Sequence, residues 1–191
     1  MEEQFAPVFR TLAGLRPGAV VAIDGRCGSG KSSLAAAIAR KLPCNVVHTD
    51  DFYLPPQCRD ADWMEHPAGN MDLERLRIQV LEPLRQKGEA EYRPFVCRTG
   101  EFGELRALAA RGLTVVEGSY SHHPALMEPY DLKIFLTCSA ETQEARIRAR
   151  EGDETRFLRF RQIWMPLEER YFRTFSIPEK ADLVLDTSAF F

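Results

Sequence analysis

The sequence lacks several features that would place it outside the cytoplasm. It contains no apolar run near the roughly 20 residues that a membrane-spanning helix needs. Its first residues are acidic and lack the basic and apolar regions of a signal peptide. The five cysteines are widely spaced and form no C-x-x-C pair, which argues against a zinc site and a redox motif. We therefore expect a cytoplasmic protein with no membrane partner and with reduced thiols.

An excess of charge of one sign is also missing. Lys and Arg number 25, Asp and Glu number 28, and the formal net charge is −3. A weakly acidic chain has no overall field that attracts nucleic acid, so no nucleic-acid partner is expected. The 191 residues contain no internal repeat, and 45% of them are hydrophobic. These values fit one ordinary soluble domain.

Short apolar runs alternate with longer segments of helical character. Strands are predicted near residues 18–24, 45–49, 113–117, 132–136 and 182–186. Helices are predicted near residues 5–12, 31–42, 73–87, 101–110, 141–150 and 160–175. This alternation is typical of an α/β fold in which helices cover both faces of a parallel sheet. Residues 51–71 predict a long loop and residues 88–100 a hairpin or a loop, and loops of such length are usually functional or disordered.

Residues Gly25–Ser32 match the pattern G-x-x-x-x-G-K-[ST] in full. An apolar strand precedes the motif and a helical segment follows it, which is the context of a phosphate-binding P-loop. Glycines let successive N–H groups converge on phosphate oxygens, and the helix start adds its dipole. Lys31 would reach the β- and γ-phosphates, and Ser32 would supply a hydroxyl to Mg²⁺. The predicted nucleotide-binding residues are Gly25, Gly28, Ser29, Gly30, Lys31, Ser32 and Ser33.

Acidic residues follow two of the predicted strands. Asp50 and Asp51 come directly after the second strand, and Glu117 ends the third. Neighbouring parallel strands deliver their C-terminal ends to one edge of the sheet, beside the P-loop. A carboxylate there can accept the proton of an acceptor hydroxyl, and Glu117 suits a Walker-B-type acid near Mg²⁺. The predicted metal set is Ser32, Asp50 and Glu117, and the choice of Asp50 or Asp51 as the base stays open.

An arginine-rich segment lies near the end of the chain. Its members are Arg146, Arg148, Arg150, Arg156, Arg159 and Arg161. In phosphoryl transfer, arginines neutralise charge on the transferred group, and a mobile segment can bring them in when substrate binds. The alternative is a solvated helix face with Glu–Arg pairs. By contrast, Phe160 and Trp164 are expected to pack in the core.

In this order, Gly25–Ser32, Asp50–Tyr53, Val116–Gly118 and the arginine-rich segment resemble the uridine kinase-like family of P-loop kinases. That family lies near phosphoribulokinase and the bacterial-type pantothenate kinase. The resemblance spans about residues 20–188. It implies one P-loop kinase domain over residues 1–191, with an α/β fold, a five-stranded parallel sheet with helices on both faces, and a short Arg-rich lid over about 146–161. The acceptor region would be about 50–72 and 88–100.

The resemblance also implies roles for single residues. Asp50 matches the catalytic aspartate that takes the acceptor proton and helps to hold Mg²⁺, and Glu117 matches the Mg²⁺-side glutamate. Tyr53 matches an aromatic residue of the acceptor site. Arg146 and Arg150 fall where the family places its catalytic lid arginines.

The acceptor region departs from the family pattern Asp-His-Pro-Asp-Ala-Phe-Asp. This chain has Glu65-His66-Pro67-Ala68-Gly69-Asn70-Met71-Asp72 there, so the His-Pro and the final acid remain while the register differs. Glu65 or Asp72 would contact an acceptor hydroxyl, and either suits a helix cap equally well. The predicted acceptor-binding residues are Asp51, Tyr53, Glu65 and Asp72.

The function that the resemblance implies is an ATP- and Mg²⁺-dependent kinase acting on a hydroxyl of a small metabolite, with a nucleoside as the leading acceptor. The alternatives are another acceptor such as pantothenate, GTP in place of ATP, and a regulatory nucleotide-binding NTPase without an acceptor. The sequence lacks the guanine-reading Asn-Lys-x-Asp run of a GTPase. It leaves the oligomeric state open, and a homodimer is one option.

Overall fold

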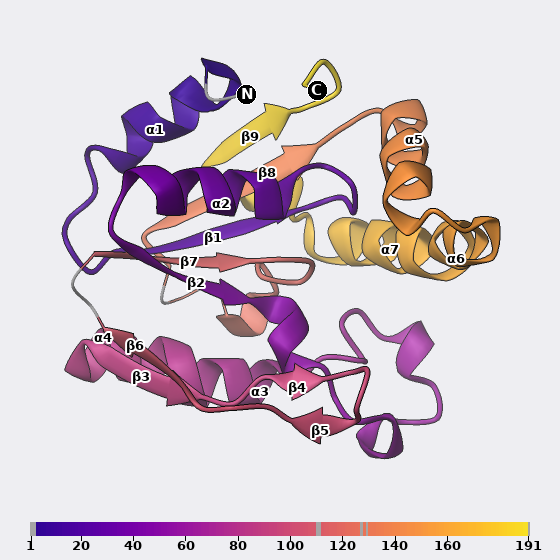
Figure 1. Cartoon of the computed structure of the whole chain (residues 1–191), viewed down its shortest axis with the longest axis horizontal. Coiled ribbons are helices and arrows are strands. Elements are labelled where there is room, and N and C mark those ends of the chain that lie inside the picture. The colour runs from indigo at the N-terminus through magenta and orange to yellow at the C-terminus, as the bar shows by residue number, and fades with distance from the viewer. Residues whose placement is uncertain (1–2, 110–111, 127, 129, 191) are drawn as a thin grey trace.

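Five parallel strands form the centre of the fold in the order β2-β7-β1-β8-β9, as seen in a computed structural model (Figure 1). The structure describes residues 3–109, 112–126, 128 and 130–190. The strands are β1 Val20–Gly25, β2 Cys44–His48, β7 Leu113–Glu117, β8 Leu132–Thr137 and β9 Leu183–Asp186. Every neighbouring pair is parallel, so the predicted five-stranded parallel sheet is confirmed.

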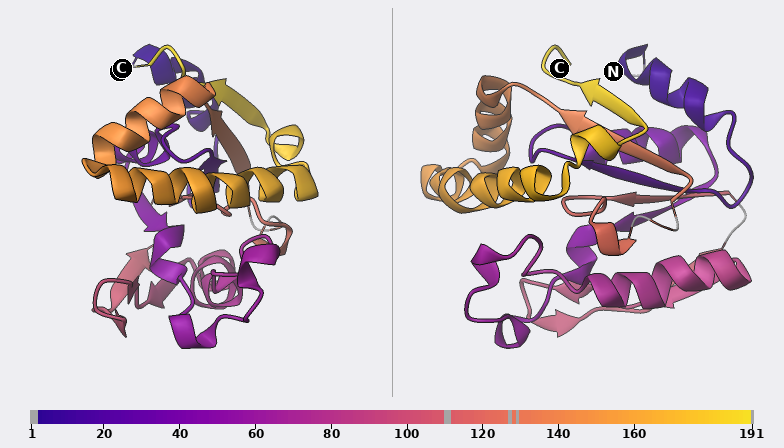
Figure 2. Two further views of the ribbon diagram at one scale, coloured as in Figure 1. Left: turned by 90° about the vertical axis from the view of Figure 1, so that its right-hand side faces the viewer. Right: turned by 180° about the vertical axis from the view of Figure 1, so that it is seen from behind.

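Helices cover both faces of this sheet (Figure 2). They are α1 Ala6–Leu12, α2 Lys31–Lys41, α3 Leu73–Leu76, α4 Glu82–Lys87, α5 Ala140–Glu151, α6 Glu154–Arg159 and α7 Met165–Phe175. A π-helical segment, Arg77–Leu81, joins α3 to α4, and another, Phe160–Trp164, joins α6 to α7. Short 3-10 turns lie at Glu3–Phe5, Thr49–Phe52, Pro56–Cys58, Trp63–Glu65, Pro124–Leu126 and Pro178–Lys180.

Alternating side chains of the central strands divide the core between the two faces. Ile23 of β1 and Ile134 of β8 pack with Leu34 of α2 on the face that α1 and α2 cover. Phe135, the next residue of β8, packs with Tyr171 of α7 on the other face. β1 and β7 are buried along their whole length, which explains why their sequences are mainly apolar.

The helix predicted for residues 101–110 is wrong. Residues Glu101–Phe102 form β5 and Arg106–Ala109 form β6, while residue 110 lies outside the described residues. β6 pairs antiparallel with β3, Glu89–Tyr92, and β5 pairs with β4, Phe95–Val96. Helix propensities differ by only about 0.7 kcal/mol per residue or less. Strand pairing, with Leu108 buried in one cluster with Val80 and Tyr92, outweighs that local preference.

The predicted long loop at residues 51–71 is irregular apart from 3-10 turns and one bridge between Tyr53 and Met71. This loop, together with β3 to β6 and α3 to α4, forms the lower part of the molecule in Figure 1. Within the part of the chain that the structure describes, no helix is both long and apolar enough to cross a membrane.

Candidate active site

The P-loop, Gly25–Ser32, connects the end of β1 to the start of α2. A Cβ atom at Gly25 would lie 2.0 Å from the carbonyl oxygen of Leu136, so only glycine fits beside β8. Gly30 adopts φ +96° at the N-cap of α2 and offers no side chain to the first helical turn. The backbone N–H groups of that turn are therefore available to an anion.

The residues of the loop fit a phosphate group. The side-chain oxygen of Ser29 is fully buried and has no hydrogen-bond partner among the described residues. Lys31 Nζ donates to the carbonyl oxygens of Gly25, at 2.6 Å, and Arg26, at 3.0 Å. Lys31 thus rests on neutral acceptors, which phosphate oxygens can replace with a stronger, charged interaction.

Two of the three residues predicted to hold Mg²⁺, Ser32 and Glu117, meet at the end of β7. Ser32 Oγ donates to Glu117 Oε1 over 3.1 Å, and His48 Nδ1 lies 2.5 Å from the same oxygen. The hydrogen bond with Glu117, and then its charge, raises the pKa of His48 against the effect of burial. No group of three or more Asp, Glu, His and Cys among the described residues could hold a metal by itself. Ser32 and Glu117 still suit Mg²⁺, which usually binds to one or two carboxylates together with nucleotide phosphates.

Asp50 lies on the 3-10 turn that follows β2, and its carboxylate faces the same cavity as Lys31 and Glu117. Tyr53 Oη donates to Asp50 Oδ1 over 3.0 Å. The surrounding cavity walls raise the pKa of Asp50 by desolvation, while the hydrogen bond from Tyr53 lowers it. The charge of Glu117 raises this pKa and the charge of Lys31 lowers it. The net direction is upward, which suits a group that accepts and releases a proton.

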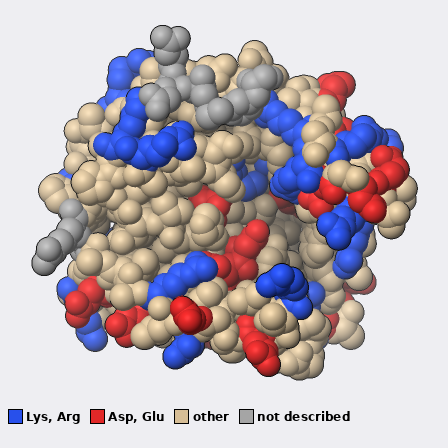
Figure 3. Space-filling view, viewed as in Figure 1, with Lys and Arg blue, Asp and Glu red and all other residues tan. Residues whose placement is uncertain are grey.

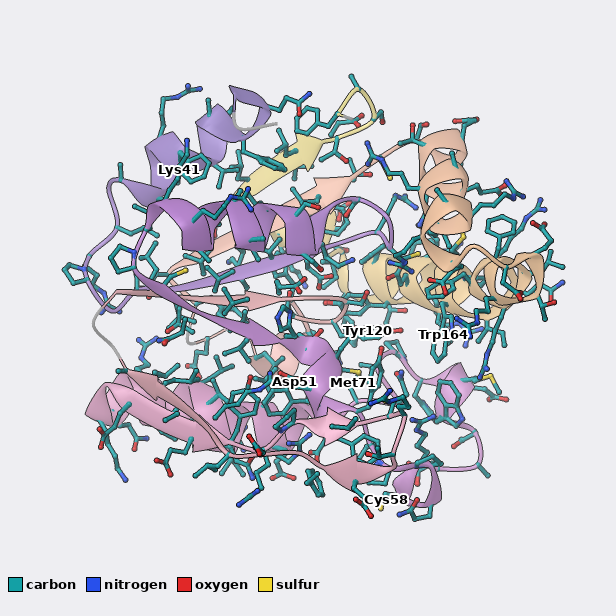
Figure 4. All side chains as sticks on the ribbon, viewed as in Figure 1. Lys41, Asp51, Cys58, Met71, Tyr120 and Trp164 are labelled. Atoms are coloured by element: carbon teal, nitrogen blue, oxygen red, sulfur yellow. The ribbon has the colours of Figure 1, made fainter. Side chains whose placement is uncertain are left out.

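These groups line one cavity of about 920 Å³. Figure 3 shows a hollow on this face of the molecule with acidic and basic atoms around it. Of the residues labelled in Figure 4, Tyr120 and Trp164 line the cavity and Asp51 does not. Trp164 was expected in the core, but it is half-buried and lines the cavity. Its ring centroid lies 5.9 Å from that of Trp63. Phe160 lines the cavity too, and it packs against the buried residues Cys27, Ile147 and Phe157.

The arginines of the predicted lid differ in their contacts. Arg146 donates to the carbonyl oxygens of Gly28, at 3.2 Å, and Thr187, at 2.6 Å, and so ties the C-terminal segment to the P-loop. Arg150 lines the cavity, packs over the Phe160 ring and pairs with Glu151. The predicted contact of Arg146 and Arg150 with phosphate stays a prediction.

Arg159 differs from Arg146 and Arg150 in its side-chain contacts. It lines the cavity, and its side chain forms no hydrogen bond or ion pair with any described residue. Its guanidinium is therefore a further candidate for contact with the nucleotide phosphates.

Three of the four predicted acceptor-binding residues do not line the cavity. Asp51 accepts hydrogen bonds from Tyr92 Oη, at 2.9 Å, and from Arg106, at 2.5 Å, so its charge is used within the fold. Asp72 caps α3 by accepting from the N–H of Arg75. Glu65 also lies outside the cavity lining, which leaves Tyr53 as the member of this set that the structure brings to the site.

Glu168 of α7 is a site residue that the sequence analysis missed. Only 4% of Glu168 is exposed, and its carboxylate accepts from the N–H of Cys27, at 2.8 Å, and from Ser119 Oγ, at 2.5 Å. Burial first, and then the charge of Glu168, raises the pKa of the Cys27 thiol. One glutamate within a charged helix gives no sequence signal for a contact 141 residues away.

Asp24 was also missed, although a charged residue at the end of an apolar strand is a usable signal. It is fully buried and accepts from the N–H groups of Gly25 and His122 and from Tyr171 Oη. These three hydrogen bonds satisfy the buried carboxylate and hold the start of the P-loop against the loop after β7 and against α7.

Comparisons with known proteins agree with this arrangement. Residues 21–163 match the model of a family described as AAA domain. A possible uridine kinase from Bacillus stearothermophilus superposes with a TM-score of 0.74 at 17% identity, over 97% of this chain and 98% of that chain. A candidate fructose transport system kinase from Silicibacter gives 0.64 at 23% identity, over 93% and 94%.

A D-glycerate 3-kinase from Cryptococcus neoformans gives a TM-score of 0.57 at 16% identity, over 86% of this chain and 84% of that chain. A comparison with proteins of curated function finds no match. At these identities the solved structures establish the fold, and the family match covers most of the chain. The protein therefore belongs to the AAA domain family and has the fold of the uridine kinase-like P-loop kinases.

Proposed function

We propose that the protein is a kinase that transfers the γ-phosphoryl group of ATP to a hydroxyl of a small metabolite. The observation that carries the proposal is the meeting of four groups in one cavity from three strand ends. Lys31 and Ser32 follow β1, Asp50 follows β2 and Glu117 ends β7. Phosphoryl transfer requires little covalent chemistry from a protein, so positioning and electrostatics at such an edge supply most of the catalysis.

The P-loop would bind the nucleotide phosphates through its N–H groups, and Lys31 would leave its two carbonyl partners to neutralise them. Ser32 and Glu117 would hold Mg²⁺. When bound, the metal supplies positive charge to the phosphate oxygens. Arg150 and Arg159, which line the same cavity, would add charge where it develops on the transferred group.

Asp50 would act as the general base. As the acceptor oxygen attacks the γ-phosphorus, its proton moves to a carboxylate oxygen of Asp50, and ADP leaves with the broken bond's electron pair. The raised pKa favours this role because a carboxylate with a pKa nearer neutrality takes a proton more readily. Asp51 suits the role less well, since its carboxylate is paired with Arg106 outside the cavity.

The fold leaves the acceptor open. The names of the similar structures refer to uridine, to fructose transport and to D-glycerate, which are chemically different. A nucleoside is the acceptor that the family resemblance implies. The choice of ATP over GTP and a cytoplasmic location also remain part of this proposal.

The proposal is tested by measuring ADP formation with a panel of nucleosides, deoxynucleosides, nucleoside monophosphates, pantothenate and simple sugars. We expect one acceptor to raise turnover well above basal hydrolysis in the wild type and not in Asp50→Asn. Equal slow hydrolysis in both proteins, with every acceptor, would instead favour a regulatory NTPase.

Replacing Glu117 by glutamine is expected to weaken the dependence on metal. The amide keeps the shape of the side chain but removes the charge beside Ser32 Oγ. We expect the Mg²⁺ concentration for half-maximal activity to rise about 10–100-fold. A Mg²⁺ titration at saturating nucleotide measures it, with Glu141→Gln, an exposed residue in the first turn of α5, as the matched control. An unchanged titration curve would remove Glu117 from the metal site.

Replacing Tyr53 by phenylalanine is expected to shift the acid limb of the kcat–pH profile to higher pH. Tyr53 Oη donates to Asp50 and lowers its pKa, so loss of the hydroxyl raises that pKa further. Because the base must be ionised, activity is then lost at a higher pH as the solution is acidified. A profile whose acid limb stays in place, or moves to lower pH, would contradict the hydrogen bond's role.

A further inference from the structure

We propose that the acceptor carries an anionic group, a carboxylate or a phosphate, and that Arg59 and Asn70 bind this group. The inference rests on the proposed kinase function and names the substrate class for the same cavity. It comes from the cavity wall that the loop of residues 51–71 contributes, where neither residue was part of the sequence-based site.

Arg59 forms no ion pair with a described residue. Its side chain is half-buried and lines the cavity. Its Nε donates to the carbonyl oxygen of Leu54 over 3.0 Å, and the guanidinium packs 5.4 Å from the centre of the Trp63 ring. No carboxylate among the described residues forms an ion pair with it. Charged groups that lose water are normally paired, so a half-buried arginine at a cavity wall is suited to a ligand anion.

Asn70 adds an unused donor at the same place. It is 2% exposed and lines the cavity, and its side-chain nitrogen has no hydrogen-bond partner among the described residues. A buried polar group without a partner costs about 1–3 kcal/mol, and a bound ligand oxygen would satisfy it.

The backbone of Leu54 connects Arg59 and Asn70 to the segment that carries the proposed base, Asp50. The carbonyl oxygen of Leu54 accepts from Arg59, and the N–H of Leu54 donates to the carbonyl oxygen of Asn70 over 2.9 Å. Leu54 follows Tyr53, whose hydroxyl binds Asp50. The backbone at Leu54 thus connects Arg59 and Asn70 to the turn that carries Asp50, and all three residues line the same cavity.

The charges along the cavity fix the direction of the acceptor. Asp50 and Glu117 repel an anion from the end where transfer occurs. The other lining cations are Lys31 of the P-loop and Arg146, Arg150 and Arg159 of the α5–α6 segment, on the nucleotide side. Among the described lining residues, Arg59 is the cation that the acceptor loop supplies.

The remaining wall suits an apolar body between the hydroxyl and the anion. Trp63 and Trp164 lie with ring centroids 5.9 Å apart and line the cavity together with Met64. A hydroxy acid or a phosphorylated alcohol would satisfy Arg59 and Asn70 and turn its hydroxyl to Asp50. A neutral nucleoside would leave Arg59 unpaired, so we expect anionic acceptors to be preferred.

The test uses matched anionic and neutral probes: D-glycerate with glycerol, pantothenate with pantothenyl alcohol, and uridine monophosphate with uridine. ADP formation is measured for each, together with calorimetric binding of each probe in the presence of Mg²⁺ and a non-hydrolysable ATP analogue. The first two pairs report on a carboxylate and the third on a phosphate. We expect at least one anionic member to exceed its neutral counterpart about tenfold in kcat/KM.

Variants assign that preference to Arg59. In Arg59→Met we expect the KM of the anionic acceptor to rise about 10–100-fold, with the KM of ATP within twofold of wild type. Arg59→Lys should recover part of the loss because it keeps the charge. Arg170→Met is the matched control: Arg170 also donates to the acceptor loop, at the carbonyl oxygen of Met64, but does not line the cavity.

The other outcomes separate a failure of the anion site from a failure of the kinase proposal. A neutral acceptor used equally well by wild type and Arg59→Met would overturn the anion site and leave the kinase intact. A raised KM for ATP with an unchanged KM for the acceptor would assign Arg59 to the nucleotide. If no acceptor is phosphorylated, binding of an anionic probe that Arg59→Met abolishes would support the site while the kinase proposal fails. Absence of both turnover and binding would overturn both.

Discussion

Replacing Lys31 by alanine is expected to lower kcat on the order of 10³-fold. In the structure its ammonium group lies on the carbonyl oxygens of Gly25 and Arg26 and faces the cavity. It is therefore held near the bound phosphates before any nucleotide arrives. Its removal takes away the positive charge at the point where negative charge builds up during transfer, and water in the vacated space would replace it poorly. Steady-state ADP formation at saturating acceptor measures the effect.

Lys41→Ala is the matched control for this prediction. Lys41 ends the same helix, at the far end from the P-loop (Figure 4), so the two variants share the chemical change and the helical context. We expect Lys41→Ala to keep wild-type kcat. Retention of more than about a tenth of the activity in Lys31→Ala would show that this lysine does not stabilise the transition state in the way proposed here.

Asp50→Asn is expected to lower kcat about 10²–10⁴-fold while the Kd of ATP stays within twofold. The amide is isosteric with the carboxylate and can still accept the hydrogen bond from Tyr53. It cannot take the acceptor proton, so transfer fails while the P-loop remains intact. Single-turnover measurements and equilibrium nucleotide binding, made on the same protein, separate the two effects.

Asp51→Asn is the control that decides between the two aspartates. Asp51 is bound to Tyr92 and Arg106, outside the cavity lining. Its loss should lower the melting temperature and leave kcat within about tenfold, since one positioning contact is weakened. The reverse pattern, an active Asp50→Asn and an inactive Asp51→Asn, would move the general base to Asp51.

Much of the fold could be predicted because strands that are buried on both faces of a sheet have mainly apolar sequences. β7 begins and ends at the expected residues, since Leu113–Glu117 is a short, mainly apolar and β-branched run closed by one acid. The segment of residues 101–110 failed for the opposite reason. Its alanines and two leucines favour a helix locally, whereas its strand state depends on β3, whose position no local pattern reveals.

The candidate site divides in the same way. The P-loop residues are consecutive, and Asp50 and Glu117 follow from the rule that parallel strands end at one edge. Arg59 and Glu168 could not be found like this, because a loop without regular structure carries one and the seventh helix carries the other. Their contacts depend on how those segments fold back onto the sheet. Asp72, which was predicted to bind the acceptor, instead caps α3, a role that its position before a helical segment also predicted.

The strand order has a consequence for the way this chain is made. β1 and β2 are the members of the sheet that precede residue 110, and β7 separates them. A nascent polypeptide therefore carries a finished P-loop sequence with neither flanking strand available until residues 113–137 have left the ribosome. Assembly of the nucleotide site depends on the pairing of β1 with β7 and β8, which are far from β1 in the sequence, and pairings of this kind form slowly. The early product of synthesis is therefore an apolar β1 without a neighbour, and exposed strands of this kind are prone to aggregation.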